Sequence, residues 1–255
     1  MKTERSAILA TTTYARSDCN FERVRANLAL STIYEAKQHN YDIVVVDGGS
    51  PDAYIYQMID LDALVYQQEI PGMGNARRQS LRQAKEVVSE NGAVVWLEPE
   101  KSTLVPLLRP AVDKIVTESY DLVMFRRKNL DSYPPEQIYT YKMVELAFKY
   151  LTNIECDFLF GPIALSKRSV DYFLAYKSKY GDVWDSIHIP KLYIIKDGLP
   201  WTQVEIDYQH PEVQTQAELG NMDLFIKRVE QIRVVTEALI SEVHNIGLLP
   251  LDQKF

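Results

Sequence analysis

Short runs of apolar and β-branched residues alternate with longer segments of helical periodicity along the first hundred residues. Asp42–Asp47 (Asp-Ile-Val-Val-Val-Asp) is uninterrupted, which is typical of a strand covered on both faces. Asn20 can cap a helix in which Phe21, Val24 and Leu28 recur at helical spacing. The elements predicted for this half are strands at 6–12, 42–47, 64–66 and 93–97 and helices at 20–38 and from 72 onward. Their order predicts an α/β fold with a doubly wound, mostly parallel sheet flanked by helices.

Strands and helices alternate less regularly in the second half of the chain. The predicted elements are strands at 121–125 and 159–165, the second bent at Gly161-Pro162, and helices at 137–151, 167–176 and 184–196, the last at least after Pro190. A long C-terminal helix is predicted at 223–244, ended by Gly247 and Pro250. Its apolar stripe favours packing against the core over a partner surface, and consists of Phe225, Val229, Ile232, Leu239 and Val243. No repeat or linker interrupts the chain, so we expect one domain over 1–255.

Composition and charge exclude several classes of protein. The 255 residues, 46% of them hydrophobic, can bury a stable core without disulfide bonds. A net charge of −7 disfavours extended binding to nucleic acid. Two cysteines, Cys19 and Cys156, give neither a disulfide framework nor a zinc cluster. No apolar run approaches the ~20 residues of a transmembrane segment, and polar threonines interrupt the start too early for a secretory signal. We therefore expect a reduced, cytoplasmic protein.

Acidic residues follow two of the predicted strands, at the edge where such sheets bind ligands. Asp47 ends the second strand, and Glu98 and Glu100 follow the fourth. Two carboxylates one residue apart in extended backbone point the same way and can share one divalent cation, which in turn can hold a diphosphate. Asp47 could accept hydrogen bonds from a base or ribose. Pro99 leaves a second interpretation open, in which Glu-Pro-Glu is the acidic first turn of a helix.

A glycine-containing segment, Gly72-Met73-Gly74-Asn75-Ala76-Arg77-Arg78, opens the helix after the third strand. Glycines allow close backbone approach, and the N–H groups of a helix start are available to an anion. Arg77 or Arg78 could add bidentate contacts to phosphate. The segment is neither a P-loop nor Gly-x-Gly-x-x-Gly, and it follows a later strand than the first βα turn, which disfavours a Rossmann dehydrogenase.

The order of these motifs resembles that of the GT-A fold glycosyltransferases. The motifs are Thr11-Thr12-Thr13, Val-Val-Val-Asp47-Gly-Gly-Ser-Pro-Asp52, Gly74-Asn75-Ala76-Arg77 and Val-Val-Trp-Leu-Glu98-Pro-Glu100. The resemblance implies a GT-A-like (Rossmann-like) fold with a nucleotide-binding half at 1–103, an acceptor-binding half at 104–210 and a C-terminal helical segment at 211–255. It places Glu98 and Glu100 at the positions of the metal-binding Asp-x-Asp. The residues it implies for the nucleotide sugar are Thr11, Thr13, Asp47, Gly74, Arg77, Arg78 and Glu98.

Two departures from the family pattern bear on the metal. Each glutamate of Glu98-Pro-Glu100 carries one methylene more than aspartate, and Gly48 replaces the second Asp of the usual strand-end pair. Glutamate still offers oxygen ligands to Mg²⁺ or Mn²⁺, although the reach changes. Three interpretations stay open: a displaced metal, a metal-independent enzyme and an inactive site.

The segment Gly181-Asp182-Val183-Trp184-Asp185 is similar to the Glu-Asp-x-x-Leu segment of the same superfamily. There an acidic residue at a helix start faces the acceptor and often serves as general base in inverting members. Asp185 is the first candidate for a catalytic residue here and Asp182 the second. Ordinary helix capping is the structural alternative for both.

The segment Tyr208-Gln209-His210-Pro211 is similar to the C-terminal segment of the retaining mannosylglycerate synthases. In those enzymes a histidine before the last helix completes the metal site. His210 would then join Glu98 and Glu100 as a metal ligand, and because imidazole suits Mn²⁺ better than Mg²⁺, Mn²⁺ is the first metal to assay.

Together these features predict a glycosyltransferase that moves a sugar from a nucleoside-diphosphate sugar to a hydroxyl of a small molecule or glycan, assisted by Mn²⁺ or Mg²⁺. Retention or inversion of configuration stays open. One alternative is a nucleotidyltransferase, although residues 11–16 lack the glycines usual in that class after the first strand. The other is a non-catalytic nucleotide-sugar-binding protein of the same fold. The sequence also allows a homo-oligomer, and tyrosines at 139–150 suit either stacking on sugars or core packing.

Overall fold

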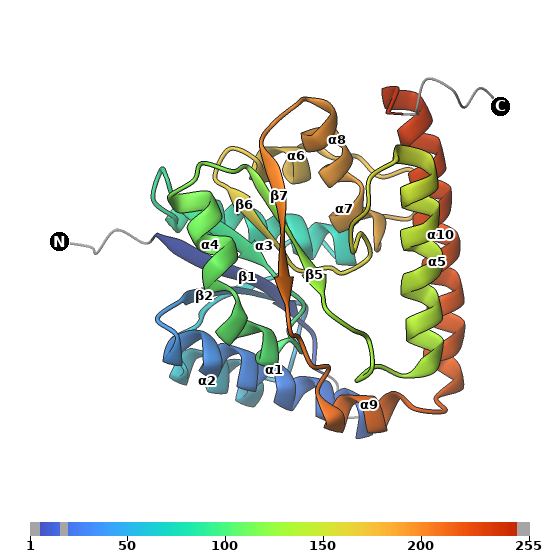
Figure 1. Cartoon of the computed structure of the whole chain (residues 1–255). Coiled ribbons are helices and arrows are strands. Elements are labelled where there is room, and N and C mark those ends of the chain that lie inside the picture. Colours follow the sequence, from blue (N-terminus) through green and yellow to red (C-terminus); the bar gives the residue numbers. More distant parts are fainter. Residues whose placement is uncertain (1–5, 16–19, 249–255) are drawn as a thin grey trace.

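Seven strands form one sheet between layers of helices in the computed structural model, which describes residues 6–15 and 20–248 (Figure 1). The strands are β1 (Ala7–Thr13), β2 (Asp42–Asp47), β3 (Leu64–Gln67), β4 (Ala93–Trp96), β5 (Leu122–Arg127), β6 (Ile163–Ser166) and β7 (Trp201–Ile206). The helices are α1 (Asn20–Gln38), α2 (Asp52–Asp60), α3 (Met73–Val87), α4 (Arg109–Val116), α5 (Pro135–Thr152), α6 (Val170–Ala175), α7 (Asp185–His188), α8 (Pro190–Lys196), α9 (Glu212–Glu218) and α10 (Met222–Ile246), with a 3₁₀ helix η1 (Ser102–Leu107). Arg16 and Cys19 lie outside the described residues.

The strand order is β3-β2-β1-β4-β6-β5-β7. All neighbouring strands are parallel except β6, which runs antiparallel to both β4 and β5. The register aligns Thr13 of β1 with Asp47 of β2, and Asp47 with Gln67 of β3. The carboxyl ends of these strands therefore meet at one edge of the sheet, as expected of a ligand-binding edge.

Apolar side chains of the central strands make the core. Val44, Val45 and Val46 of β2 are fully buried, as the uninterrupted β-branched run predicts. Helix α3 packs on β1 and β2, and α4 packs on β5 and β6 from the opposite side of the sheet (Figure 1). The predicted α/β fold with a mostly parallel sheet and a long C-terminal helix is confirmed.

The predicted bounds agree with the observed ones for some helices and strands and not for others. The predicted bounds of α1 and β2 are those observed, whereas the predicted helix at 184–196 is divided into α7 and α8 at Ile189. Helix α2, strand β7 and the short helices η1, α4 and α9 were not predicted. Strand β7 is half-exposed at the end of the sheet, so its sequence lacks the apolar run that identifies the buried strands.

Helices α5 and α10 lie side by side at one edge of the molecule, away from the sheet (Figure 1). Along α10 the prediction that the apolar stripe packs in the core is correct for Leu239 and Val243, which are buried. It is wrong for Phe225 and Val229, which are about half exposed, because no described element covers the outer side of the first turns. Among the helices of residues 6–15 and 20–248, none is long and apolar enough to cross a membrane.

Candidate active site

A pocket of about 640 Å³ opens at the carboxyl ends of β1, β2 and β4. Its volume lies in the ordinary range for small-molecule sites. Three residues that the sequence singles out, Thr13, Arg77 and Glu98, line it. Helix α1 and the start of α3 supply much of the remaining wall, through Glu22, Arg25, Ala26, Ala29, Gly72, Met73 and Ala76.

Glu98 lines this pocket and also has a carboxylate oxygen without a partner. Its Oε2 is buried and has no hydrogen-bond partner among the residues that the structure describes. Gly161 makes room for the group, because a Cβ at that position would come within 2.0 Å of Glu98 Oε1. Buried polar atoms almost always have partners, so an orphaned carboxylate oxygen indicates a position where a cation or donor binds.

Glu100 is engaged with helix α1 instead of the pocket. Arg25 Nη2 lies 3.2 Å from Glu100 Oε1 and 3.4 Å from Oε2. Burial raises the pKa of Glu100, but the charges of Arg25 and Lys101 outweigh it and lower the pKa to about 2. Glu100 is therefore an ionised carboxylate with a cationic partner in place.

His210 is buried beside a second carboxylate. Its ring stacks on Tyr133 at 4.4 Å between centroids, and its Nε2 lies 3.4 Å from Glu218 Oε2. Burial is the largest effect and lowers the pKa of His210, whereas the nearby carboxylate of Glu218 opposes it. The imidazole is therefore neutral at physiological pH.

The three predicted metal ligands do not form one cluster in this structure. Within residues 6–15 and 20–248, no group of three or more His, Cys, Asp and Glu side chains is arranged to hold a metal ion. Glu100 is paired with Arg25, and His210, whose ring nitrogens have no hydrogen-bond partner among the described residues, lies beside Glu218 and not on the pocket. Glu98 is the member of the three that lines the pocket, and its Oε2 also lacks a partner.

Asp47 holds the loop that follows β2. Its Oδ1 accepts from the backbone N–H groups of Gly49 (2.9 Å) and Ser50 (2.7 Å), and its Oδ2 accepts from the hydroxyls of Thr13 (2.7 Å) and Ser50 (2.6 Å). The side chain is fully buried and shapes the wall that Gly48 presents to the pocket. Thr11, also predicted for the nucleotide, lies buried within β1 and does not line the pocket.

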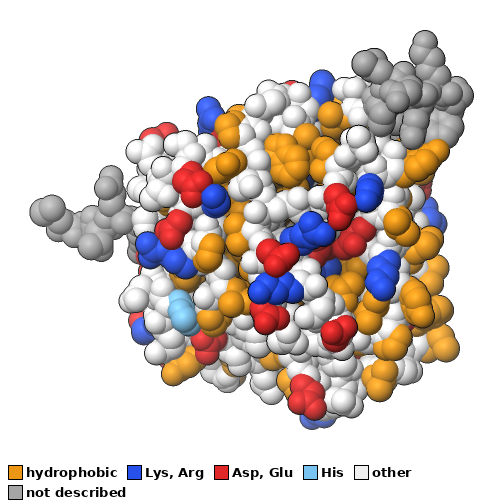
Figure 2. All heavy atoms as spheres, viewed as in Figure 1, with side chains coloured by type: hydrophobic (Ala, Val, Ile, Leu, Met, Phe, Trp, Pro, Cys, Tyr) orange, Lys and Arg blue, Asp and Glu red, His pale blue; other side chains and the backbone are white. Residues whose placement is uncertain are grey.

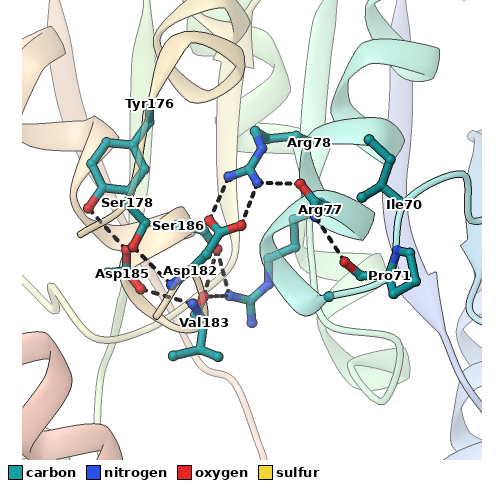
Figure 3. A network of polar contacts seen from close by, with 12 residues as sticks. Ile70, Pro71, Arg77, Arg78, Tyr176, Ser178, Asp182, Val183, Asp185 and Ser186 are labelled. Atoms are coloured by element: carbon teal, nitrogen blue, oxygen red, sulfur yellow. Dashed lines mark hydrogen bonds and ion pairs between the residues drawn. The ribbon is translucent and has the colours of Figure 1, made fainter. Parts of the chain in front are cut away.

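The start of α3 is covered by the loop around Asp182 (Figure 3). Arg78 makes a bidentate ion pair with Asp182, at 2.7 Å to Oδ1 and 2.5 Å to Oδ2. The backbone N–H of Gly74 donates to the carbonyl of Asp182 at 2.9 Å. A Cβ at Gly74 would come within 2.2 Å of Asp182 Oδ1, so glycine permits this close approach. Arg78, Gly74 and Asp182 therefore have mutual partners in this arrangement.

Arg77 joins α3 to the start of α7 and still faces the pocket. Its Nη1 donates to the carbonyl of Val183 (2.5 Å) and to Ser186 Oγ (3.1 Å) (Figure 3). Its guanidinium lies 5.2 Å from the ring of Trp96, which also lines the pocket. Burial lowers the pKa of Arg77 to about 10, with the charge of Glu98 opposing this shift. Arg77 is therefore a fixed cation at neutral pH, close enough to Glu98 to feel its charge.

Asp185 lies away from the pocket lining and is fully buried. Its Oδ1 accepts from the backbone N–H of Val183 at 2.9 Å, and its Oδ2 accepts from the hydroxyl of Tyr176 at 3.0 Å (Figure 3). The carboxylate therefore ties the first residue of α7 to the loop before it and to Tyr176, and it does not cap the helix, whose N-cap is Trp184. The catalytic role predicted for Asp185 and Asp182 stays a prediction.

Sequence reasoning missed Arg25, which lines the pocket and binds Glu100. The signal was present in the spacing, because Glu22, Arg25, Ala26 and Ala29 recur at i, i+3, i+4 and i+7 and all four line the pocket. These positions continue, over the first turns of α1, the face that Ala29, Ile33 and Ala36 bury further along the helix.

No protein-family model matches the sequence, and no curated protein matches it. Solved structures of the Mycobacterium tuberculosis glucosyl-3-phosphoglycerate synthase are similar. The form with Mn²⁺, uridine-diphosphate-glucose and phosphoglyceric acid has a TM-score of 0.64 at 16% identity, over 97% of this chain and 82% of that one. The form with Mg²⁺ and uridine diphosphate has a TM-score of 0.58 at 15% identity, over 97% and 81%. At this identity the likeness concerns the path of the chain, and it shows that this protein has the GT-A fold of those glycosyltransferases.

Proposed function

We propose that this protein is a glycosyltransferase that moves a sugar from a nucleoside-diphosphate sugar to a hydroxyl of a small acceptor. The observation that carries the proposal is a pocket at the strand ends that Arg25, Arg77 and Glu98 line together, in which Glu98 keeps one buried carboxylate oxygen without a partner among the described residues. Two cations and one free carboxylate oxygen together fit a diphosphate with a divalent cation. The pocket lies at the strand ends where ligands bind in such sheets.

The residues at the two ends of the pocket differ, and they orient the nucleoside-diphosphate sugar in this proposal. Tyr14 and Gly48 line the end near β1 and β2, where an aromatic side chain and an open backbone suit a nucleobase. Arg25, Arg77 and Glu98 line the part that β4 and the two helices approach, where the diphosphate carries its charge. The sugar then lies next to Glu98.

A divalent cation fits Glu98 together with the donor. Mg²⁺ is commonly bound by one or two carboxylates plus substrate phosphates, so one free carboxylate is a sufficient protein contribution. Glu98 would hold it, and Glu100 could join only by releasing Arg25. The cation would neutralise negative charge on the departing diphosphate. Bound Mn²⁺ and Mg²⁺ in the mycobacterial enzyme with the same fold support this choice of metals.

The chain's own residues bind the diphosphate and prepare it to leave. Arg77 is fixed by Val183, Ser186 and Trp96, so its charge needs no rearrangement as charge develops on the leaving group. The acceptor hydroxyl attacks the anomeric carbon as the bond to the diphosphate breaks. Phosphoglyceric acid, bound by the mycobacterial enzyme, makes a phosphorylated hydroxy acid the first acceptor to assay.

The test is a release assay. The protein is incubated with uridine- and guanosine-diphosphate sugars, Mn²⁺ and phosphoglycerate, and free nucleoside diphosphate and glycosylated product are measured. We expect acceptor-dependent release that a chelator abolishes. Pyrophosphate formed from a nucleoside triphosphate and a sugar phosphate would instead identify a nucleotidyltransferase. Donor binding without turnover for every acceptor would identify a non-catalytic protein.

A further inference from the structure

An apolar face that no other described element covers runs along α5 and α10, outside the lining of the pocket. On α5, Tyr139, Met143, Leu146 and Tyr150 are each more than half exposed. They follow one another at intervals of four, three and four residues, which is the spacing of a coiled-coil seam. We define the outer face as these four residues together with Met222, Phe225, Ile226 and Val229 of α10.

The residues of α10 continue the face beside those of α5. Met222, Ile226 and Val229 also follow at four and three residues, and the exposed fractions across the outer face run from 49% to 69%. Figure 2 shows hydrophobic side chains gathered on the right of the molecule, over α5 and α10. A groove of about 490 Å³, lined in part by Tyr139 and Phe225, separates the two stripes.

The exposed area is that of an interface. A large aromatic side chain carries roughly 150–250 Å², so eight residues exposed to this degree leave on the order of 1,000 Å² of surface. The largest apolar patch on a typical monomer is about 300–600 Å². A standard protein interface buries about 800 Å² on each partner. The outer face is therefore larger than a monomer usually shows and as large as one side of a stable dimer.

Charges of opposite sign border the two sides of the outer face. Exposed Lys142 and Lys149 lie on the side of α5 turned away from α10. Three exposed acids, Asp223, Glu230 and Glu237, recur every seven residues on the side of α10 turned away from α5. Their charge is reduced but not cancelled by Arg233, which pairs with Glu230 and Glu237. Lys149 is paired with Glu155 within its own chain.

We propose that the outer face is the interface of a two-fold symmetric dimer of this chain. A two-fold axis running along the helices places α5 of one copy against α10 of the other. The same operation places the lysine border of each copy against the acidic border of its partner, so the surface is complementary to itself, as an isologous interface requires. A side chain of the second copy can fill the groove between the stripes.

A lipid surface is the less favoured occupant. Anionic membranes attract faces bordered by several basic residues, whereas this face has an acidic border on a chain of net charge −7. The proposal is independent of the proposed function, because no residue of the outer face lines the donor pocket.

The test is the oligomeric state of the full chain by analytical ultracentrifugation across a range of protein concentrations. We expect a monomer–dimer equilibrium dominated by the dimer. Leu146→Glu should weaken the dimer at least tenfold, because it buries an unpaired carboxylate at the centre of the interface. Tyr56→Glu is the matched control, since Tyr56 is an equally exposed hydrophobic residue on α2, and it should leave the dimer unchanged. Unchanged circular dichroism and melting temperature show that the variants fold.

Charge reversal tests the predicted orientation. Lys142→Glu with Lys149→Glu should weaken association, and adding Glu230→Lys with Glu237→Lys in the same chain should restore it. A wild-type protein that stays monomeric overturns the proposal. So does a dimer insensitive to Leu146→Glu, or a monomer that sediments with anionic phosphatidylglycerol vesicles. Dimerisation without charge rescue overturns the orientation of the two copies.

Discussion

The guanidinium of Arg25 and the carboxylate of Glu100 link the first helix to the loop after β4, across 75 residues of sequence. Arg25 Nη2 lies 3.2 Å and 3.4 Å from the two carboxylate oxygens. Both side chains are mostly buried, so the pair is shielded from solvent. As a result, one carboxylate of Glu98-Pro-Glu100 stabilises the fold and the other is left for a ligand.

Removing Arg25 should change how stability depends on pH. The folded-state pKa of Glu100 is lowered to about 2 from an ordinary value of 4.5, so the pair stabilises the fold above about pH 4.5 and loses this contribution as pH falls toward 2. In Arg25→Gln the buried carboxylate has lost its main partner, and burial raises its pKa. We expect a loss of about 3–5 kcal/mol at pH 7 that shrinks as the pH is lowered. Denaturant unfolding at several pH values between about 7 and 3 measures it.

The double variant Arg25→Gln/Glu100→Gln is the control. Because it leaves no unpaired charge, it should recover most of the stability lost in Arg25→Gln at pH 7 and show a weaker dependence on pH. If Arg25→Gln alone were as stable as the wild type at pH 7, the ion pair would contribute nothing to the fold.

Glu98→Gln should damage function without damaging the fold. Glu98 Oε2 has no partner among the described residues, so replacing the carboxylate by an amide removes a ligand but no internal bond. We expect turnover to fall by about 10²–10³, the range for loss of one electrostatic contact in a transition state, and the melting temperature to fall only slightly, because Glu98 also offsets the buried charge of Arg77. Binding of Mn²⁺ in the presence of uridine diphosphate, measured by calorimetry, should weaken in parallel.

A matched carboxylate outside the pocket controls for charge. Glu69 is exposed and pairs with Arg82, so Glu69→Gln changes net charge by the same amount without touching the site. It should leave turnover and metal binding intact. Equal losses in the two variants would contradict a specific role for Glu98.

The sheet and the position of its ligand edge could be predicted because each depends on local pattern. The uninterrupted β-branched run of β2 and the apolar spacing of α1 carry their bounds in consecutive residues, and the bounds of both were predicted as observed. Strand β6 runs antiparallel to its neighbours, and nothing in its four residues encodes that direction. Topology of this kind follows from long-range packing.

The partners of the site residues could not be predicted for the same reason. The sequence places Glu98 and Glu100 one residue apart and implies a shared ligand, but Arg25 approaches only one of them. Asp185 accepts a hydrogen bond from the hydroxyl of Tyr176, nine residues earlier and directly after α6. The residue type and its place at a strand end follow from consecutive residues. Whether its carboxylate is free or paired depends on which distant side chain packs beside it.

Gly161→Ala should act through Glu98. The new Cβ would come within 2.0 Å of Glu98 Oε1, so the carboxylate must move while the strand keeps its path. We expect a higher Mn²⁺ concentration for half-maximal activity and a small change in melting temperature. Gly74→Ala is the matched comparison, because its Cβ would meet Asp182 within 2.2 Å. It should disturb the Arg78–Asp182 pair and lower stability, with less effect on the metal requirement.

Asp185→Asn separates a structural role in fixing the start of α7 from general-base catalysis. In the structure both carboxylate oxygens accept hydrogen bonds within the chain, from Val183 and from Tyr176. If this is the whole role, the variant should lose about 1–2 kcal/mol of stability and keep turnover within tenfold of the wild type. Tyr176→Phe, which removes one of the two donors and no acid, should then reproduce the loss of stability.

A general base predicts the opposite pattern: turnover falls by about 10²–10⁴, the acidic limb of the pH–rate profile disappears, and Tyr176→Phe does not reproduce the defect. Denaturant unfolding and pH–rate profiles on the same three proteins decide between the two roles.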